Sequence, residues 1–131
     1  MHELPDNGIV HVNSPYPVAE TIERILKMIA AKGLTLFARI DHAAGAASVG
    51  LEMLPTELLI FGSPKSGTPL MLAAPTLAID LPLKALVWQD DADNVRVSFN
   101  SAEYLKNRHS FPADLLPNIA GLPGILEAAL R

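Results

Sequence analysis

The sequence predicts an α+β fold, a two-layer sandwich in which a mostly antiparallel sheet of about five strands carries helices packed on one face. Three observations predict it. Apolar residues recur with a helical period in some segments and alternate in others. Eleven prolines divide the chain into short elements. Two strand patterns near residue 90 are separated by an acidic turn, which indicates a hairpin. The 131 residues are therefore expected to form a single domain, residues 1–131.

The first half of the chain alternates strand and helix patterns. Val18, Ile22, Ile25 and Ile29 recur at helical spacing, whereas apolar and polar residues alternate between 34 and 40. The predicted elements are, in order, a strand over 8–12, a helix from Pro17 that Gly33 ends, a strand over 34–40, a short Ala- and Gly-rich helix over 43–50 and a strand over 57–61.

The second half adds the hairpin and the remaining helices. Its predicted elements are a helix of about two turns that Thr68 caps and Pro69 begins, strands over 83–89 and 95–100, a helix through Arg108 that Ser101 caps, and a terminal helix over 122–130. The predicted order is β-α-β-α-β-α-β-β-α. This order mixes hairpins with crossovers, which favours the α+β class.

Composition bears on partners. Half of the residues are apolar and 18% are charged, which leaves more apolar side chains than a small monomer easily buries. We therefore expect a homodimer, with the sheet edges and the apolar segment Leu70 to Leu77 as candidate surfaces. The net charge of -4 and the absence of any Lys and Arg cluster predict no nucleic-acid partner and no membrane partner.

Residue usage also bears on chemistry and location. Because the chain has no cysteine, it has no disulfide, thiol nucleophile or thiolate metal site. The first residues include His2, Glu3, Pro5, Asp6 and Gly8, which form neither a signal peptide nor a membrane span, so a cytoplasmic protein is expected. No motif calls for a cofactor, and none is predicted.

The stretch LLIFGSPKSGTPLML raises the question of a phosphate-binding loop, since Gly62 and Gly67 are separated by four residues. A Walker A loop needs Lys and then Ser or Thr directly after the second glycine, but Thr68 and Pro69 follow Gly67, and Lys65 lies inside the loop. We therefore expect a strand-to-helix turn and no binding of nucleoside triphosphates.

Four ordered motifs resemble the uncharacterised DUF302 family. They are Asp41-His42-Ala43, Phe61-Gly62-Ser63-Pro64, Gly67-Thr68-Pro69-Leu70-Met71 and Asp80-Leu81-Pro82-Leu83-Lys84. The resemblance extends in weaker form from Thr21 to about His109. It implies a two-layer α/β sandwich that tends to form dimers, and it implies no activity because no function is established for the family.

Metal and nucleophile signatures are weak. Counted from Asp91, an EF-hand loop would need Gly and Glu where Arg96 and Ala102 stand, so residues 90–94 are interpreted as a solvated turn. No metal site is predicted, because no histidine pair has helical ligand spacing. A site that folding assembles from His42, His109 and Asp80 is left as an open alternative. No Gly-x-Ser-x-Gly elbow occurs.

Asp80 and Lys84 flank Pro82, and two interpretations are open for them. They form a partly buried ion pair that fixes the entry to a strand, or they contribute to a ligand site.

Three functions remain open. The first is a homodimeric binding module for a small anionic or amphipathic molecule, with a pocket near the strand ends and the 62–68 loop. Its candidate ligand-binding residues are His42, Lys65, Thr68, Asp80 and Lys84. The second is an interaction or assembly protein without a ligand. The third is an enzyme, with or without metal, that uses His42 as a general base oriented by Asp41 or Asp80. The lack of an evident nucleophile favours a non-enzymatic role.

His42 is the residue on which the site hypothesis depends most. It follows the alternating strand over 34–40, at a position where binding residues tend to gather. The alternative is that it caps the short helix that follows or contacts a backbone carbonyl. If the site hypothesis holds, His42 lines a pocket together with at least one of Lys65, Asp80 or Lys84.

Overall fold

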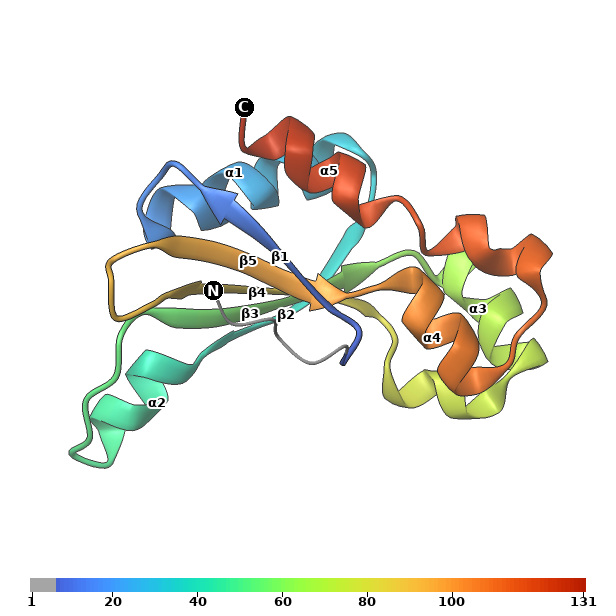
Figure 1. The fold of residues 1–131 in the computed structure, drawn as a ribbon, viewed down its shortest axis with the longest axis horizontal. Coiled ribbons are helices and arrows are strands. Elements are labelled where there is room, and N and C mark those ends of the chain that lie inside the picture. The colour runs from blue at the N-terminus through green and yellow to red at the C-terminus, as the bar shows by residue number, and fades with distance from the viewer. Residues whose placement is uncertain (1–6) are drawn as a thin grey trace.

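The computed structural model describes residues 7–131, which form a five-stranded antiparallel sheet with helices (Figure 1). The elements in chain order are β1 (Ile9–Ser14), α1 (Val18–Ala31), β2 (Thr35–Asp41), α2 (His42–Ser48), β3 (Thr56–Gly62), α3 (Pro64–Ala73), the 3-10 helix η1 (Pro75–Ile79), β4 (Leu83–Gln89), β5 (Val95–Asn100), α4 (Ala102–His109), the 3-10 helix η2 (Ala113–Asn118) and α5 (Leu122–Ala129). The predicted α+β class is confirmed.

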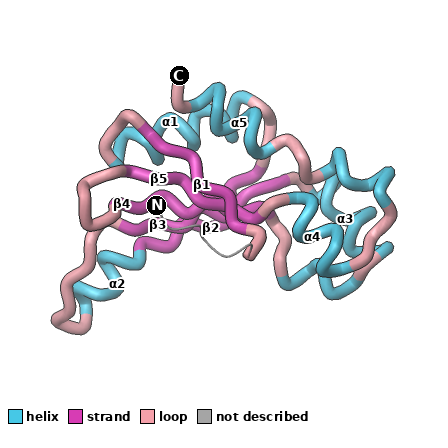
Figure 2. The backbone as a smooth tube through the Cα atoms, in the orientation of Figure 1, coloured by secondary structure: helices cyan, strands magenta, loops and turns pink. Residues whose placement is uncertain are grey.

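The strand order across the sheet is β1-β5-β4-β3-β2, and every neighbouring pair is antiparallel. Strands β2 to β5 therefore lie side by side in chain order, and β1 is added at the far edge beside β5. The chain crosses from one edge of the sheet to the other through α1, as Figure 2 shows. The predicted hairpin of β4 and β5 is present, with Gln89 opposite Val95.

Helices α1 and α5 cover one face of the sheet, where they lie above the strands in Figure 1. Strands β3, β4 and β5 alternate, so that every second side chain points to these helices. The fully buried residues of this main core include Ile25, Leu59, Phe61, Val87 and Val97. The helical period of α1 therefore places its apolar stripe on the sheet, as its sequence predicts.

A second core lies beyond one end of the sheet, where α3, η1, α4 and η2 pack together. Its buried residues are Leu70, Ala74, Leu77, Leu81, Leu105, Phe111 and Ile119. Leu70, Ala74 and Leu77 are buried in it, whereas Leu72 is 79% exposed, so the segment predicted as a contact surface is divided between core and surface. Apolar spacing in a helix that packs internally looks the same in sequence as an exposed apolar patch.

The glycine-spaced loop predicted over 62–68 is also different in the structure. Strand β3 passes into α3 almost directly, with Ser63 as N-cap and Pro64 as the first helical residue. The Ser63 carbonyl accepts hydrogen bonds from the backbone N–H groups of Ser66 and Gly67. Helix α3 thus begins five residues before the predicted start at Pro69, because Pro64 is well suited to the first helical turn.

Other boundaries shift by smaller amounts. The 3-10 helices η1 and η2 were not predicted. Strand β1 runs to Ser14 rather than to Val12. Helix α2 begins at His42, and the Asp41 carboxylate caps it by accepting a hydrogen bond from the Ala44 N–H at 2.9 Å.

The opposite face of the sheet carries a second set of apolar side chains. Strand alternation places Ile40, Leu58, Ile60, Leu86 and Trp88 on the side away from α1 and α5. We call these residues the open sheet face. At one end of the sheet, α2 and residues 49–54 project away from the body in Figure 1. Val49 and Leu51 in this arm, residues 42–54, are 70% and 64% exposed.

Candidate functional site

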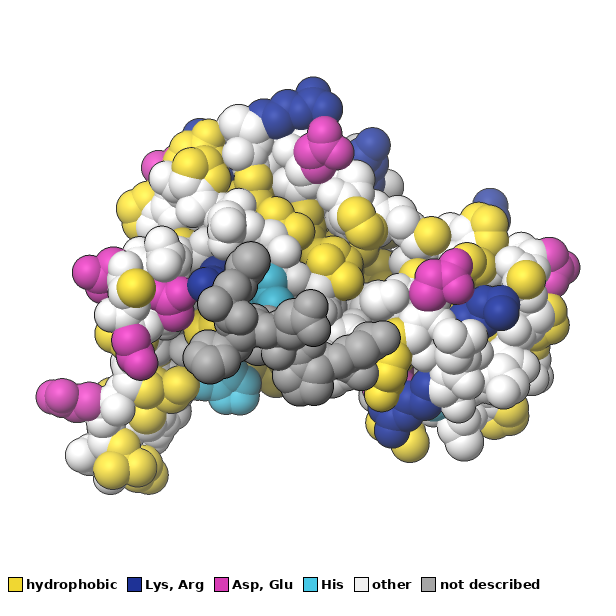
Figure 3. Space-filling view, viewed as in Figure 1, with side chains coloured by type: hydrophobic (Ala, Val, Ile, Leu, Met, Phe, Trp, Pro, Cys, Tyr) yellow, Lys and Arg dark blue, Asp and Glu magenta, His cyan; other side chains and the backbone are white. Residues whose placement is uncertain are grey.

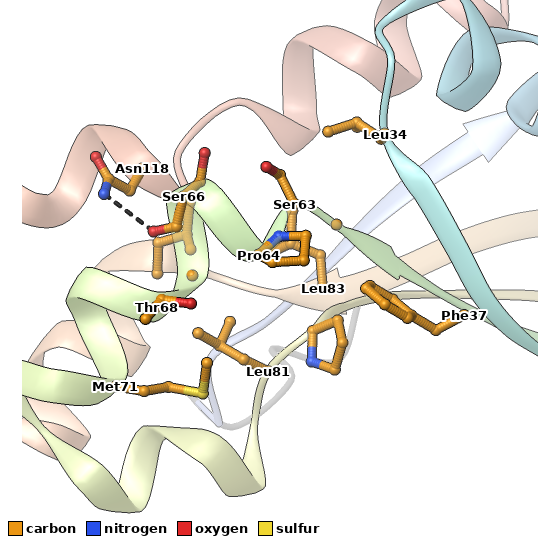
Figure 4. A pocket seen from close by; sticks show the side chains of 14 residues that line it. Leu34, Phe37, Ser63, Pro64, Ser66, Thr68, Met71, Leu81, Leu83 and Asn118 are labelled. Carbon is orange, nitrogen blue, oxygen red and sulfur yellow. Dashed lines mark hydrogen bonds between the residues drawn. The ribbon is translucent and has the colours of Figure 1, made fainter.

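A cavity of about 200 Å³ lies where the sheet meets the second core. Figure 4 shows its walls, which come from the start of β2, the end of β3, the first turns of α3, the segment 81–83 and the end of η2. Its lining residues are Leu34, Phe37, Gly62, Ser63, Pro64, Ser66, Gly67, Thr68, Met71, Leu81, Pro82, Leu83, Asn118 and Ile119. We refer to it as the α3 pocket. It lies near the strand end and the 62–68 segment, where the sequence predicted a pocket.

Local irregularities in the chain form the α3 pocket. The pairing of β2 with β3 shifts between Leu36 and Ala38, and this bulge turns Phe37 toward the pocket. Gly62 and Gly67 keep space open, since a Cβ atom at either position would lie 3.5 Å from Pro82 and 3.8 Å from Leu81, respectively. The small side chains of the 62–68 motif therefore leave room for a cavity.

Asn118 fixes the wall of the pocket that belongs to η2. Its side-chain Nδ2 donates a hydrogen bond to the Ser66 backbone carbonyl at 3.0 Å, drawn as a dashed line in Figure 4. This contact joins two elements that are distant in sequence, and it satisfies one carbonyl of a helix that contains Pro69. The pocket is therefore held open by a tertiary hydrogen bond as well as by packing.

The pocket is apolar with a polar rim. Leu34, Phe37, Met71 and Leu81 provide its apolar walls (Figure 4). The hydroxyls of Ser63, Ser66 and Thr68 make no hydrogen bond to any other residue in the described part of the chain, 7–131. None of the described residues that line it is charged. The site therefore suits an apolar group that also carries a hydrogen-bonding atom.

The predicted site residues do not all lie at this pocket. Thr68 lines it. Lys65 is exposed in the first turn of α3, next to two lining residues but outside the wall itself. Whether Thr68 or Lys65 binds a ligand stays a prediction.

His42 lies elsewhere, and its predicted convergence with the other candidates does not occur. It is exposed and follows Asp41, which pairs with Glu57 near the start of β3, whereas α3 follows the end of β3. A seven-residue strand is about 20 Å long, so the two sites lie at opposite ends of the sheet. Figure 1 shows α2 and α3 at these two ends. Helix α2 is capped by Asp41, so the alternative role of His42 as its cap is wrong too.

Lys84 fixes the start of β4, though not by the predicted ion pair with the Asp80 carboxylate. Its Nζ donates to the backbone carbonyls of Asp80 at 3.2 Å and Pro82 at 3.4 Å. Desolvation lowers the pKa of Lys84, and the charge of Asp80 opposes this by raising it. These contacts of Lys84 therefore agree better with a structural role at the entry to β4 than with a role in ligand binding.

The Asp80 carboxylate instead pairs with His109. A grouping of His42, His109 and Asp80 was one of the open alternatives, and the structure brings the last two of these residues together. His109 Nε2 lies 2.5 Å from Asp80 Oδ2, and Arg108 Nη1 lies 3.2 Å from the same oxygen. Thr76 contacts the other side of the His109 ring, with its Oγ1 2.7 Å from Nδ1. Thr76 and Arg108 were missed because no local spacing relates η1 to α4.

Two further observations concern metals and histidines. Within residues 7–131, no three His, Cys, Asp or Glu side chains are grouped so as to hold a metal ion. His11 was also missed by sequence reasoning. It lies on β1, and its Nδ1 is 2.6 Å from the Ser98 hydroxyl, which also accepts a hydrogen bond from Trp88 Nε1 at 2.8 Å.

The fold and the pocket define a small α+β domain with a mostly apolar cavity at the junction of sheet and helices. The family profile described as "Domain of unknown function DUF302" matches residues 10–129, and the chain belongs to this family. The crystal structure of the uncharacterized conserved protein DUF302 from Bacillus stearothermophilus has the same fold. Its TM-score is 0.78 at 18% identity, and the match covers 95% of this chain and 96% of that one.

Curated relatives from Brucella match the sequence more closely. "Fluoride-specific ion channel FluC 1" of Brucella suis biovar 1 (strain 1330) is 44% identical over 110 residues, which are 84% of this chain and 43% of the relative. "Fluoride-specific ion channel FluC 2" of Brucella melitensis biotype 1 gives the same identity over 41% of its length. The chain thus spans about two-fifths of these relatives. In the described part of the chain, no helix combines the length and hydropathy needed to cross a membrane.

Proposed function

We propose that this DUF302 domain is a binding module for a compact amphipathic molecule, and that the α3 pocket is its site. The single observation that carries the proposal is the pairing of apolar walls with three unpaired hydroxyls in one cavity. Ligand sites are typically concave and apolar with a few placed polar groups. These hydroxyls are partly or fully exposed to solvent, and a ligand atom in the pocket could replace water as their hydrogen-bond partner.

The charge around the pocket bears on the kind of ligand. Its described lining residues carry no charge, so the part of the ligand inside the cavity is neutral. Lys65 is exposed in the first turn of α3, beside Pro64 and Ser66 of the wall. A polar or anionic group at the mouth would therefore lie near a lysine and near the positive end of the α3 dipole. An amphipathic ligand with its apolar end inside fits both features.

We propose further that the module acts as a homodimer, with the open sheet face and the arm as its contact surface. Leu86 and Trp88 of β4 lie between Leu58 and Ile60 of β3 and the polar residues of β5 on this face. The arm adds Val49, Leu51, Met53 and Leu54, all at least 40% exposed. Exposed apolar side chains that gather on a surface often mark a contact between proteins. Light scattering that gave a monomer mass at micromolar concentration would contradict this part of the proposal.

The binding proposal is tested with two probes, hexanoate and 1-hexanol. They share an apolar chain and differ in the head group, which is charged in hexanoate and neutral in 1-hexanol. Chemical shifts of ¹⁵N-labelled protein are followed as each probe is added, and the expected changes centre on Gly67, Thr68 and Met71. Larger chemical shift changes with hexanoate indicate that an anionic head group binds near Lys65. Equal changes with both probes indicate that only the apolar chain of the probe is recognised.

A cavity-filling variant provides the matched control. Gly67→Leu places a side chain into the α3 pocket, and it is expected to abolish the shift changes. Gly45→Leu makes the same substitution in α2, where the space around the added Cβ is open, and it should leave binding unchanged. The proposal is overturned if neither probe shifts the pocket residues up to its solubility limit, or if Gly67→Leu binds as well as the unmodified protein.

A second candidate function is a role in fluoride handling, and one observation favours it. The curated relatives at 44% identity are named fluoride-specific ion channels, although the chain matches about two-fifths of their length. We propose that the domain serves in the same process. Deleting its gene should then raise the fluoride sensitivity of the host, with chloride at equal concentration as the control. Unchanged growth in fluoride would contradict this second candidate and leave the pocket proposal standing.

A further inference from the structure

Thr76, His109 and Asp80 form a continuous hydrogen-bonded chain at the second core, apart from the α3 pocket. The Thr76 hydroxyl lies 2.7 Å from His109 Nδ1, and His109 Nε2 lies 2.5 Å from Asp80 Oδ2. None of the three lines the α3 pocket. Thr76 belongs to η1, Asp80 follows η1 directly, and His109 is the last residue of α4. These hydrogen bonds thus connect a hydroxyl, an imidazole and a carboxylate in that order.

The order of partners fixes where the proton of the imidazole lies. An ionised carboxylate only accepts hydrogen bonds, so in the neutral ring Nε2 carries the proton and donates it to Asp80. His109 Nδ1 is then unprotonated, and it accepts the hydrogen bond of the Thr76 hydroxyl. This is the arrangement in which a histidine acts as a base toward a hydroxyl while an acid orients the ring.

Exposure separates the roles of the three side chains. The His109 side chain is 4% exposed and that of Asp80 is 13% exposed, whereas Thr76 is an exposed residue. Arg108 gives Asp80 a second cationic partner, with Nη1 3.2 Å from Oδ2. The base and its orienting acid are therefore enclosed, and the hydroxyl faces the outside, where a substrate can reach it.

The surface beside Thr76 is apolar. In a 3-10 helix residues three apart lie one above the other, so Ile79 lies on the same side of η1 as Thr76. Ile79 is 71% exposed, so its side chain is accessible to an apolar group. An apolar group held against Ile79 would lie next to the Thr76 hydroxyl.

From this geometry we propose a second, catalytic site that transfers short apolar acyl groups from activated esters. Thr76 Oγ1 attacks the ester carbonyl carbon and forms the new C–O bond, while His109 Nδ1 takes the hydroxyl proton. The bond to the leaving oxygen then breaks, and His109 returns the proton to that oxygen, which departs as an alcohol. Water releases the acyl group from Thr76 by the same proton transfers in reverse. Asp80 acts as a positioning residue.

The test measures hydrolysis of p-nitrophenyl acetate and p-nitrophenyl butyrate by the whole chain, with mass spectrometry of the peptide that contains Thr76. Catalysis above the rate with buffer alone and a transient acyl adduct on Thr76 are expected, with butyrate preferred because of Ile79. Thr76→Val keeps the shape of the side chain and should remove both signals. Thr76→Ser should retain them. Loss of a general base typically costs about 10²- to 10⁴-fold, which sets the loss expected for His109→Asn.

Asp80→Asn distinguishes a positioning role from a structural one. The amide donates to Nε2, which forces the proton onto Nδ1 and removes the base that faces Thr76. We expect kcat to fall while KM stays the same and the fold is kept by circular dichroism. His11→Asn is the matched control, since His11 contacts the Ser98 hydroxyl without a carboxylate, and its rate should equal that of the unmodified protein. Hydrolysis no faster than in buffer, or full activity in Thr76→Val, overturns the proposal.

Discussion

Arg39 and Glu57 form an ion pair across β2 and β3 in which both Nε and Nη2 of Arg39 lie 2.9 Å from the same carboxylate oxygen, Oε2. The Glu57 side chain is 11% exposed and points to the side of the sheet that α1 covers, whereas that of Arg39 is 43% exposed. A nearly buried carboxylate is thus neutralised by an arginine that remains partly in water.

Removing the arginine is therefore expected to destabilise the protein. Arg39→Ala should lower the free energy of unfolding by about 1–2 kcal/mol, because Glu57 keeps its desolvation cost without its partner. Urea denaturation measures this. Arg131→Ala is the matched control, since Arg131 pairs with Glu127 at 4.0 Å with both side chains more than three-quarters exposed, and it should change stability by less than about 0.5 kcal/mol. Equal effects of the two substitutions would contradict the role assigned to burial.

Gly8 is expected to tolerate no side chain. Its φ is +78°, and a Cβ atom there would lie 2.1 Å from Cγ of the Tyr104 ring. Gly33 has a similar φ of +68°, but nothing lies within 4 Å of its added Cβ. Gly33→Ala therefore reports the backbone cost alone, about 1–2 kcal/mol. Gly8→Ala should lower the thermal midpoint further than Gly33→Ala, and the excess should disappear when Tyr104→Ala is also present.

Lys84 makes stability depend on pH in the alkaline range. Its pKa in the folded protein is lowered below the ordinary 10.5 by desolvation, so between these two values the unfolded chain binds more protons than the folded one. This contribution therefore strengthens as pH rises through the lowered pKa toward 10.5. Relative to Lys84→Met, which has no titrating group, the unmodified protein should gain stability over that window. Denaturation at a series of pH values up to 10.5 checks it, and a constant difference would contradict it.

Asp90 makes stability rise with pH as Lys84 does, but in the acid range. The backbone N–H of Asn94 lowers its pKa most, and the Ala92 N–H, the Asn94 side chain and Arg96 act in the same direction. Its stabilising effect is therefore complete above the ordinary value of 3.8 and is lost as pH falls through the lowered pKa. Asp90→Asn keeps an accepting oxygen but no charge. It should be less stable than the unmodified protein at neutral pH and equally stable in strong acid.

Much of the fold follows from local sequence signals. The helical period of α1 and the alternation of β3, β4 and β5 place the same residues in the core that the patterns indicate. The start of α3 was misplaced because Thr68 and Pro69 look like a helix start, yet Ser63 and Pro64 provide an earlier one. Two helix starts are therefore compatible with the local sequence, and the structure has the earlier one, with Leu70 of the longer helix in the second core.

The candidate site was predicted in part. The small residues of 62–68 pointed to a cavity near Thr68, because a chain that lacks side chains there leaves space. Phe37 and Asn118 were not found, since they reach the cavity through a bulge and through contacts between distant segments. The predicted position of His42 was wrong for a related reason. Because β2 and β3 are antiparallel, the residues that follow them lie at opposite ends of the sheet, and the order of the motifs in the sequence does not reveal this.

The pairing of β1 with β5 has a consequence for how the protein folds. Strands β2 to β5 meet partners that are near in sequence, but Ile9 pairs with Asn100 and Ser14 with Val95, so β1 closes a loop that contains most of the domain. Closing so long a loop delays the pairing of β1 with β5, because the chain loses conformational entropy before the stabilising contacts form. The β2–β5 meander is therefore expected to form first, and β1 to dock last, as the strand whose amide hydrogens exchange with solvent soonest.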